Sequence, residues 1–165
     1  MMLRTRGVAQ AAALVIAAAV VAGCSSAPTT LSKPNFIRAA DAICAATTTK
    51  IDAIPQLSAS ATPAQAVAPV QQALTIVEQT VTQLTALHAA SGDAAVLDKN
   101  LIEPAKAQDA AAQTFITAMQ AANGDTAAQQ TAITRFSSAT NDPNQDAEDS
   151  ALAAYGFDAC AKTSQ

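Results

Sequence analysis

The sequence predicts an all-α protein whose domain is an antiparallel, up-down four-helix bundle with kinked helices. Apolar residues recur three and four positions apart through most of the chain, which is the spacing of one face of an α-helix. Alanine dominates the 50% hydrophobic content, aromatic residues make up 3%, and tryptophan is absent, so the core must form where helices approach closely. Two short turns containing Gly-Asp, at 89–93 and 121–125, are expected to place consecutive helices antiparallel.

Residues 1–23 have the organisation of a signal peptide and are expected to be removed. Arg4 and Arg6 supply the positive charge, and the apolar run 8–21 that follows is too short to be a comfortable membrane span. The segment then reads Val-Ala-Gly-Cys, which resembles the bacterial lipobox. This resemblance implies that Cys24 is lipidated and becomes the first residue of the mature protein. An ordinary leader followed by a chance cysteine is the alternative.

A lipid on Cys24 would hold the protein on the extracytoplasmic face of the cell membrane without a transmembrane helix, because each buried CH₂ contributes about 0.8 kcal/mol. We expect residues 24–31 to form a flexible linker rich in Ser, Thr and Pro, and residues 32–165 to form one helical domain. Loss of the two leader arginines changes the net charge from −4 to −6. An acidic domain with no basic stripe is a poor candidate for binding nucleic acid.

Cys44 and Cys160 are the two cysteines that remain when Cys24 is lipidated. An oxidising compartment makes their pairing the simplest outcome. The disulfide would close a loop of about 116 residues, which is worth about 4 to 5 kcal/mol in the chain-entropy model. The alternative, a redox pair or a thiolate nucleophile, would need a Cys-x-x-Cys spacing or a histidine base, and neither is evident.

A first helix is predicted for residues 33–54. Ser32 stands at the cap position, Pro34 lies in the first turn, and Pro55 follows the last residue. The apolar stripe of this helix consists of Phe36, Ala40, Ile43, Thr47, Ile51 and Ile54. A polar connection at 55–61 separates it from the next helix.

The second helix is predicted to begin at 62–65, where Thr-Pro-Ala-Gln combines a cap, a proline at the first helical position and a capping-box glutamine. Its stripe is the most regular in the chain: Val67, Val70, Leu74, Val77, Val81 and Leu84. Gly92 is expected to end this helix in the left-handed conformation, and Asp93 to cap the third helix. Pro104 should kink the third helix near its middle.

The fourth helix is predicted to open at Asp125, in a turn of the same type. Pro143 should bend it or interrupt it briefly, after which it resumes as far as Tyr155 and ends at Gly156. The up-down order brings this end beside the start of the first helix. The residues after Gly156 must therefore double back along the first helix for Cys160 to meet its partner.

Two segments of the domain carry a resemblance to a known group of proteins. They are Phe-Ile-Arg-Ala-Ala-Asp-Ala-Ile-Cys at 36–44 and Tyr-Gly-Phe-Asp-Ala-Cys at 155–160. Together they resemble the two signatures of small mycobacterial-type, actinobacterial secreted and lipoprotein helical domains, most of which have no assigned activity. The resemblance implies the cysteine pair and an envelope location, and it supplies no catalytic residues.

Two weak candidate sites can be named. His88 is the only histidine and would occupy the next position of the second helix's stripe, where a haem or metal ligand is conceivable but a structural role at the helix end is the better interpretation. Asp142, Asn144 and Asp146 have the alternate spacing of a calcium loop. Alanine stands where that loop needs its glycine and its bidentate glutamate, so an acidic, solvated helix start is the better interpretation.

The leading functional hypothesis is a non-enzymatic envelope lipoprotein, anchored through Cys24, that displays a binding or interaction module. The second is a carrier of an apolar ligand, either lipid or haem, held between helices that Pro69 and Pro104 open. The third is a hydrolase, which would need His88 close to a hydroxyl and a carboxylate. No catalytic residue and no cofactor is assigned, and the partner or ligand is not identified.

Overall fold

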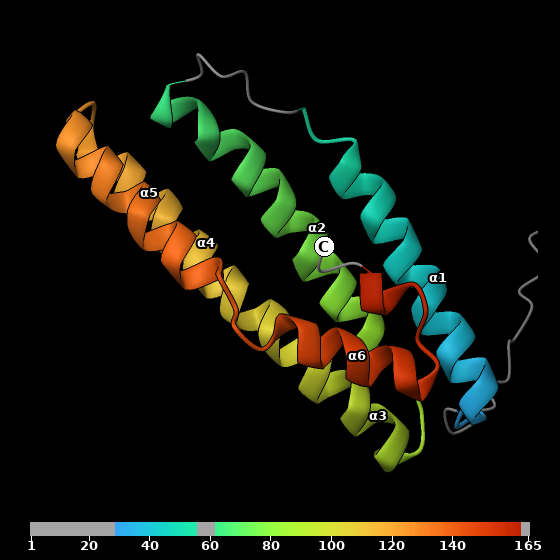
Figure 1. Ribbon diagram of the computed structural model, residues 1–165. Helices are drawn as coiled ribbons and strands as arrows, with labels where there is room; N and C mark the ends of the chain where they lie inside the picture. The colour runs from blue at the N-terminus through green and yellow to red at the C-terminus, as the bar shows by residue number, and fades with distance from the viewer. Residues whose placement is uncertain (1–28, 56–61, 163–165) are drawn as a thin grey trace, which may run out of the picture.

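The computed structural model describes residues 29–55 and 62–162, and these form an all-α structure without strands (Figure 1). The leader at 1–23, Cys24, most of the linker at 24–31 and most of the connection at 55–61 lie outside the described residues. The predicted fold class is confirmed.

The α-helices are α1 (Lys33–Asp52), α2 (Val67–Thr85), α3 (Ser91–Leu97), α4 (Glu103–Ala122), α5 (Thr126–Thr140) and α6 (Gln145–Tyr155). Short 3₁₀ turns form η1 (Pro63–Ala66) and η3 (Cys160–Lys162), and a π-helical turn forms η2 (Asp98–Ile102). Because α3, η2 and α4 are continuous, they make one bent helix. The four main helices are therefore α1, α2, this bent helix and α5, each packed against the one before it (Figure 1).

Two apolar clusters hold the helices together. The first cluster lies where α1, α2, α3, α6 and the chain end meet, and its buried members are Phe36, Ala40, Cys44, Leu84, Leu97, Ile102, Leu152, Phe157, Cys160 and Ala161. The second cluster lies among α2, α4 and α5, and its buried members are Phe115, Ile116, Met119 and Ala132. Helix α5 lies against α4 on the side of the molecule away from α1 (Figure 1).

The predicted kink in the third helix is confirmed, and it takes the form of the π-helical turn η2 directly before Pro104. A proline has no N–H to donate and its ring clashes with the preceding turn. The chain accommodates this by widening one turn, in which the N–H of Glu103 donates to the carbonyl oxygen of Asp98, five residues earlier. The bend directs α3 towards α6 and α4 towards α5.

The turn predicted at 89–93 is wrong in its details. Helix α2 ends at Thr85, Ala90 caps α3 in an extended conformation, and Gly92 lies inside α3 instead of in the left-handed region. The reason is tertiary: the N–H of Leu31 donates to the carbonyl oxygen of His88 at 2.6 Å, in an isolated bridge that holds this segment extended.

The second predicted turn is confirmed. Asn123 and Gly124 both have positive φ angles, of 42° and 89°, and so reverse the chain between α4 and α5. The carboxylate of Asp125 then accepts the N–H groups of Ala127 and Ala128 at 2.9 and 3.1 Å. Local chemistry alone explains this cap, because all its partners lie within three residues.

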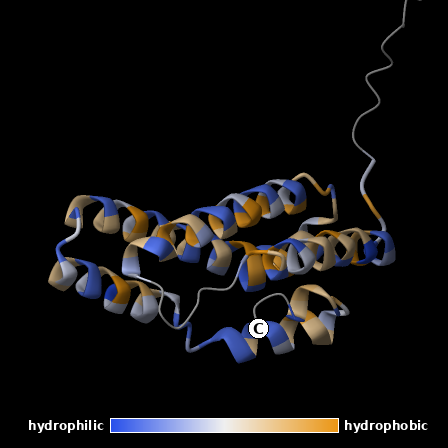
Figure 2. Cartoon of the chain, turned by 90° about the horizontal axis from the view of Figure 1, so that it is seen from above, coloured by the Kyte–Doolittle hydropathy of each residue, from blue (hydrophilic) through white to orange (hydrophobic). Residues whose placement is uncertain are grey.

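The fourth predicted helix is interrupted at Pro143, as expected, and the two parts go to different places. Helix α5 ends at Thr140, and α6 turns away to pack against α3 and η2 (Figure 1). The connection and first turn of α6 are strongly hydrophilic (Figure 2). Gly156 ends α6 with a φ of 112°, which confirms the predicted terminator.

The two segments that carry the resemblance meet in space around a disulfide. Cys44 on α1 is bonded to Cys160, with their Cα atoms 5.0 Å apart. The rings of Phe36 and Phe157 pack edge to face with centroids 5.7 Å apart. The carboxylate of Asp41 accepts the backbone N–H groups of three residues in the tail, namely Asp158, Ala159 and Cys160, at 3.1, 2.9 and 3.1 Å. One helix face therefore binds the chain end through a covalent bond, a ring contact and a carboxylate.

Tyr155 fastens α3 to the same region. Its hydroxyl donates to the carboxylate of Asp93, so the predicted capping role of Asp93 is wrong. This hydrogen bond raises the pKa of Tyr155. The tyrosine ring stacks on Phe157 with centroids 5.4 Å apart, and the Nζ of Lys33 lies 3.7 Å from its centroid. Asp93 was misassigned because its partner lies 62 residues away.

Candidate functional site

His88 does not lie in the stripe of α2. The helix ends three residues earlier, and the imidazole is exposed in the segment that joins α2 to α3. The structural contribution of this residue comes from its backbone carbonyl, which pairs with Leu31. Within 29–55 and 62–162, no group of three or more His, Cys, Asp or Glu side chains is placed to hold a metal ion.

The acidic segment before α6 forms a turn. An oxygen of the Asp142 carboxylate accepts the N–H of Asn144 at 2.8 Å, and Asp146 lies in the first turn of α6. Carboxylates at a helix start interact favourably with the helix dipole, which agrees with the structural interpretation of this pattern.

A small internal cavity of about 90 Å³ lies beside the bend at Pro104. Thr47 and Thr80 reach its wall and share a buried hydrogen bond of 2.6 Å between their hydroxyl groups. Glu148 lies at its edge, where desolvation followed by the nearby charges of Asp142 and Asp149 raises the pKa of its carboxyl. The cavity has room for a few water molecules and is too small for haem or an acyl chain.

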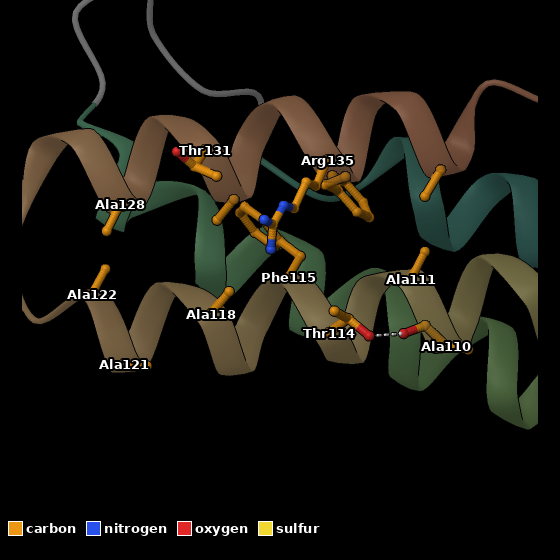
Figure 3. Close-up of a pocket in the computed structure, with 13 residues that line it drawn as sticks. Ala110, Ala111, Thr114, Phe115, Ala118, Ala121, Ala122, Ala128, Thr131 and Arg135 are labelled. Carbon is orange, nitrogen blue, oxygen red and sulfur yellow. Dashed lines mark hydrogen bonds between the residues drawn. The ribbon is translucent and has the colours of Figure 1, made fainter.

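The site best suited to a ligand is a groove of about 610 Å³ between α4 and α5 (Figure 3). We call it the α4–α5 groove. It is lined by Ala110, Ala111, Thr114, Phe115, Ala118, Ala121, Ala122, Ala128, Thr131, Ala132, Arg135, Phe136 and Ala139. Its volume falls within the range of small-molecule sites. None of the sequence-predicted site residues lies in it.

The groove exists because α4 and α5 are amphipathic in an unusual way. On α4, the large apolar residues Ile116 and Met119 turn towards α2 and belong to the second cluster. The side of α4 and α5 that forms the groove carries mainly alanine, whose methyl groups leave space along the seam. Phe115 and Phe136 stack with centroids 4.8 Å apart and help to line the groove.

Polar groups in the groove are few, and two of the three are already engaged. The hydroxyl of Thr114 donates to the carbonyl of Ala110 at 2.8 Å, and that of Thr131 donates to the carbonyl of Ala127 at 2.9 Å. Arg135 is the one charged side chain of the lining. It extends from α5 across the groove towards Phe115 (Figure 3), and the described residues offer it no salt bridge. The groove is therefore an apolar surface with a single free cation.

A pair of acidic residues faces the α2–α4 interface, apart from the groove. Partial burial, followed by the charge of Glu78, raises the pKa of Asp109 from 3.8 to about 6. Because the folded state holds this proton more tightly than the unfolded state, the free energy of unfolding should rise as the pH falls from 7 towards 4.

We expect the variant Asp109→Asn to be more stable than the wild type at pH 7 and to lose part of this pH dependence. Thermal melting at pH 7, 6, 5 and 4 measures it, with the exposed Asp52→Asn as the matched control. Glu148 titrates in the same direction in every variant, so the difference between variants isolates Asp109. Equal melting temperatures for wild type and Asp109→Asn at pH 7 would contradict the assignment.

Comparison of the chain with models of protein families, with curated proteins and with solved structures gave no match. Among the described helices, none is both long enough and apolar enough to cross a membrane.

Proposed function

We propose that this protein is a non-enzymatic binding module, held on the extracytoplasmic face of the cell membrane by a lipid on Cys24, and that the α4–α5 groove is its binding surface. The observation that carries the proposal is the groove itself. It is concave, lined mainly by methyl groups and phenylalanine rings, and has one free cation. Its lining includes neither a histidine nor a carboxylate, so it is built for contact with an apolar ligand and offers no general base.

The position of the groove suits display from an anchor. Leu31 is held at the junction of α2 and α3, and it lies seven positions after Cys24, a separation that can span at most about 25 Å. That end of the domain would stay near the membrane. The turn between α4 and α5 lies at the opposite end of the molecule from the start of α1 (Figure 1). An anchored molecule would therefore present the far end of the groove away from the bilayer.

Binding in the groove can be tested with 1-anilinonaphthalene-8-sulfonate, an apolar anionic dye whose fluorescence rises on burial. We expect saturable binding of one dye per molecule, and we expect Ala118→Trp, which fills the middle of the groove, to weaken it at least about tenfold. Ala107→Trp is the matched control, because Ala107 lies on the same helix, is exposed and is not part of the lining.

Unchanged dye binding by a folded Ala118→Trp variant would overturn the assignment of the groove. The anchor is tested separately by intact-mass spectrometry of protein purified from membranes of an actinobacterial host. A lipid mass on Cys24 and release of Cys24→Ala into the soluble fraction are expected, and an unlipidated wild type in the membrane fraction would contradict the anchor.

A further inference from the structure

We propose that the α4–α5 groove binds a single-chain amphiphile with an anionic end, of the class of the long-chain carboxylates, with its chain along the seam of alanines and its carboxylate on Arg135. This inference rests on the proposed function and names the ligand class for the same site. Three features of the groove support it: its shape, the small number of polar groups in its lining, and its charge.

The shape fits a linear chain. The lining on α4 runs from Ala110 to Ala122, which corresponds to about 18 Å along the helix axis. Arg135 reaches this seam beside Phe115, so the part from there to Ala122 offers about 10 Å for the chain next to its carboxylate. Across the seam, Ala122 faces Ala128 (Figure 3), and alanines make up most of the lining. The groove holds about 610 Å³, which is enough room for part of one acyl chain.

The few polar groups of the groove favour an alkyl chain over an extended peptide as the occupant. Such a peptide would bring backbone N–H and C=O groups that need partners when they are buried. The backbone groups of α4 and α5 are engaged within their own helices, and the hydroxyl groups of Thr114 and Thr131 donate to helix carbonyls. An alkyl chain has no polar groups along its length, so it can be buried against this lining without losing hydrogen bonds.

The charge of the groove selects the end group. Arg135 supplies a planar guanidinium that can bind a carboxylate through two parallel hydrogen bonds. No acidic side chain lines the groove to compete for it. The occupant that the charge favours is therefore one with a single anionic group that Arg135 can bind.

Titration calorimetry with monomeric palmitate tests the proposal on the full mature protein. We expect one palmitate to bind per molecule, and we expect Arg135→Met to weaken the binding about tenfold or more, because methionine keeps the apolar stem and removes the charge. Arg135→Lys should restore part of the affinity. Lys106→Met, which removes an exposed charge of α4 outside the lining, is the matched control and should bind palmitate as the wild type does.

Methyl palmitate, which has the same chain and no charge, gives the second arm. It should bind the wild type more weakly than palmitate and should be insensitive to Arg135→Met. Equal palmitate affinity in wild type and Arg135→Met would overturn the role of Arg135, and the absence of palmitate binding would overturn the ligand class.

The two proposals fail in different ways. In one outcome, Ala118→Trp abolishes binding of the dye while palmitate neither binds the wild type nor displaces the dye. That result would support the groove as the binding surface and would contradict the amphiphile as its ligand. A partner helix with a central acidic residue is then the occupant to test. If Ala118→Trp leaves dye binding unchanged, the proposed function falls together with this inference.

Discussion

Removal of the Cys44–Cys160 disulfide is expected to lower the free energy of unfolding by about 4 to 5 kcal/mol. The bond joins residues 116 positions apart, so its loss releases almost the whole domain from a covalent loop in the unfolded state. Small domains are stable by only about 5 to 15 kcal/mol in total. The domain without the bond should therefore be close to unfolding at 37 °C.

Urea unfolding of the double variant Cys44→Ala/Cys160→Ala measures this effect against the oxidised wild type. Both thiols would be buried, and alanine at these positions leaves no unpaired polar group. The reduced wild type is the control, because it keeps every side chain and loses only the covalent bond. If the oxidised and reduced proteins unfold within about 1 kcal/mol of each other, the bond does not hold the domain together.

Phe157→Ala is expected to lower the free energy of unfolding by about 3 to 5 kcal/mol even with the disulfide intact. Its side chain is 0% exposed, and its ring contacts those of Phe36 and Tyr155. Truncation would leave a cavity between α1 and α6 that the surrounding helices cannot close, because the disulfide and the Asp41 hydrogen bonds hold the tail in place.

The measurement is urea unfolding followed by circular dichroism, with Phe157→Leu as the matched variant. Leucine keeps much of the volume, so it should cost clearly less than alanine. A loss smaller than about 1 kcal/mol for Phe157→Ala would show that the tail packs loosely on α1.

The residues expected to contribute most to stability lie apart from the proposed binding surface. The disulfide, Phe157 and Asp41 all belong to the region where the tail meets α1, whereas the groove lies beside the second cluster. Phe157→Ala should therefore reduce stability while a folded sample still binds the dye. Ala118→Trp should weaken binding of the dye while leaving the free energy of unfolding nearly unchanged.

Features that depend on neighbouring residues could be predicted from the sequence. The start of α1 at Lys33, the cap by Asp125 and the helix end at Gly156 follow from residues within one turn of each feature. The bend at Pro104 follows from the missing N–H of that proline, whereas its π-helical form was seen only in the structure. The alanine-rich composition likewise determined that the fold is helical.

Features that depend on distant residues could not be predicted in this way. Gly92 was placed in a turn because local chemistry favours glycine there, but the bridge between Leu31 and His88 moved the turn and removed His88 from α2. Asp41 binds backbone groups 117 to 119 residues away, so no spacing in the sequence reveals its role.

The groove shows the same division. The sequence determined that α4 and α5 are rich in alanine and carry few large apolar residues. Only the tertiary structure decided that Ile116 and Met119 face α2 and that many of the alanines line a groove together with Phe115 and Phe136. The sequence pattern of an alanine stripe is the same in a close-packed core and in the wall of a groove. Whether the stripe is buried depends on whether another helix covers it.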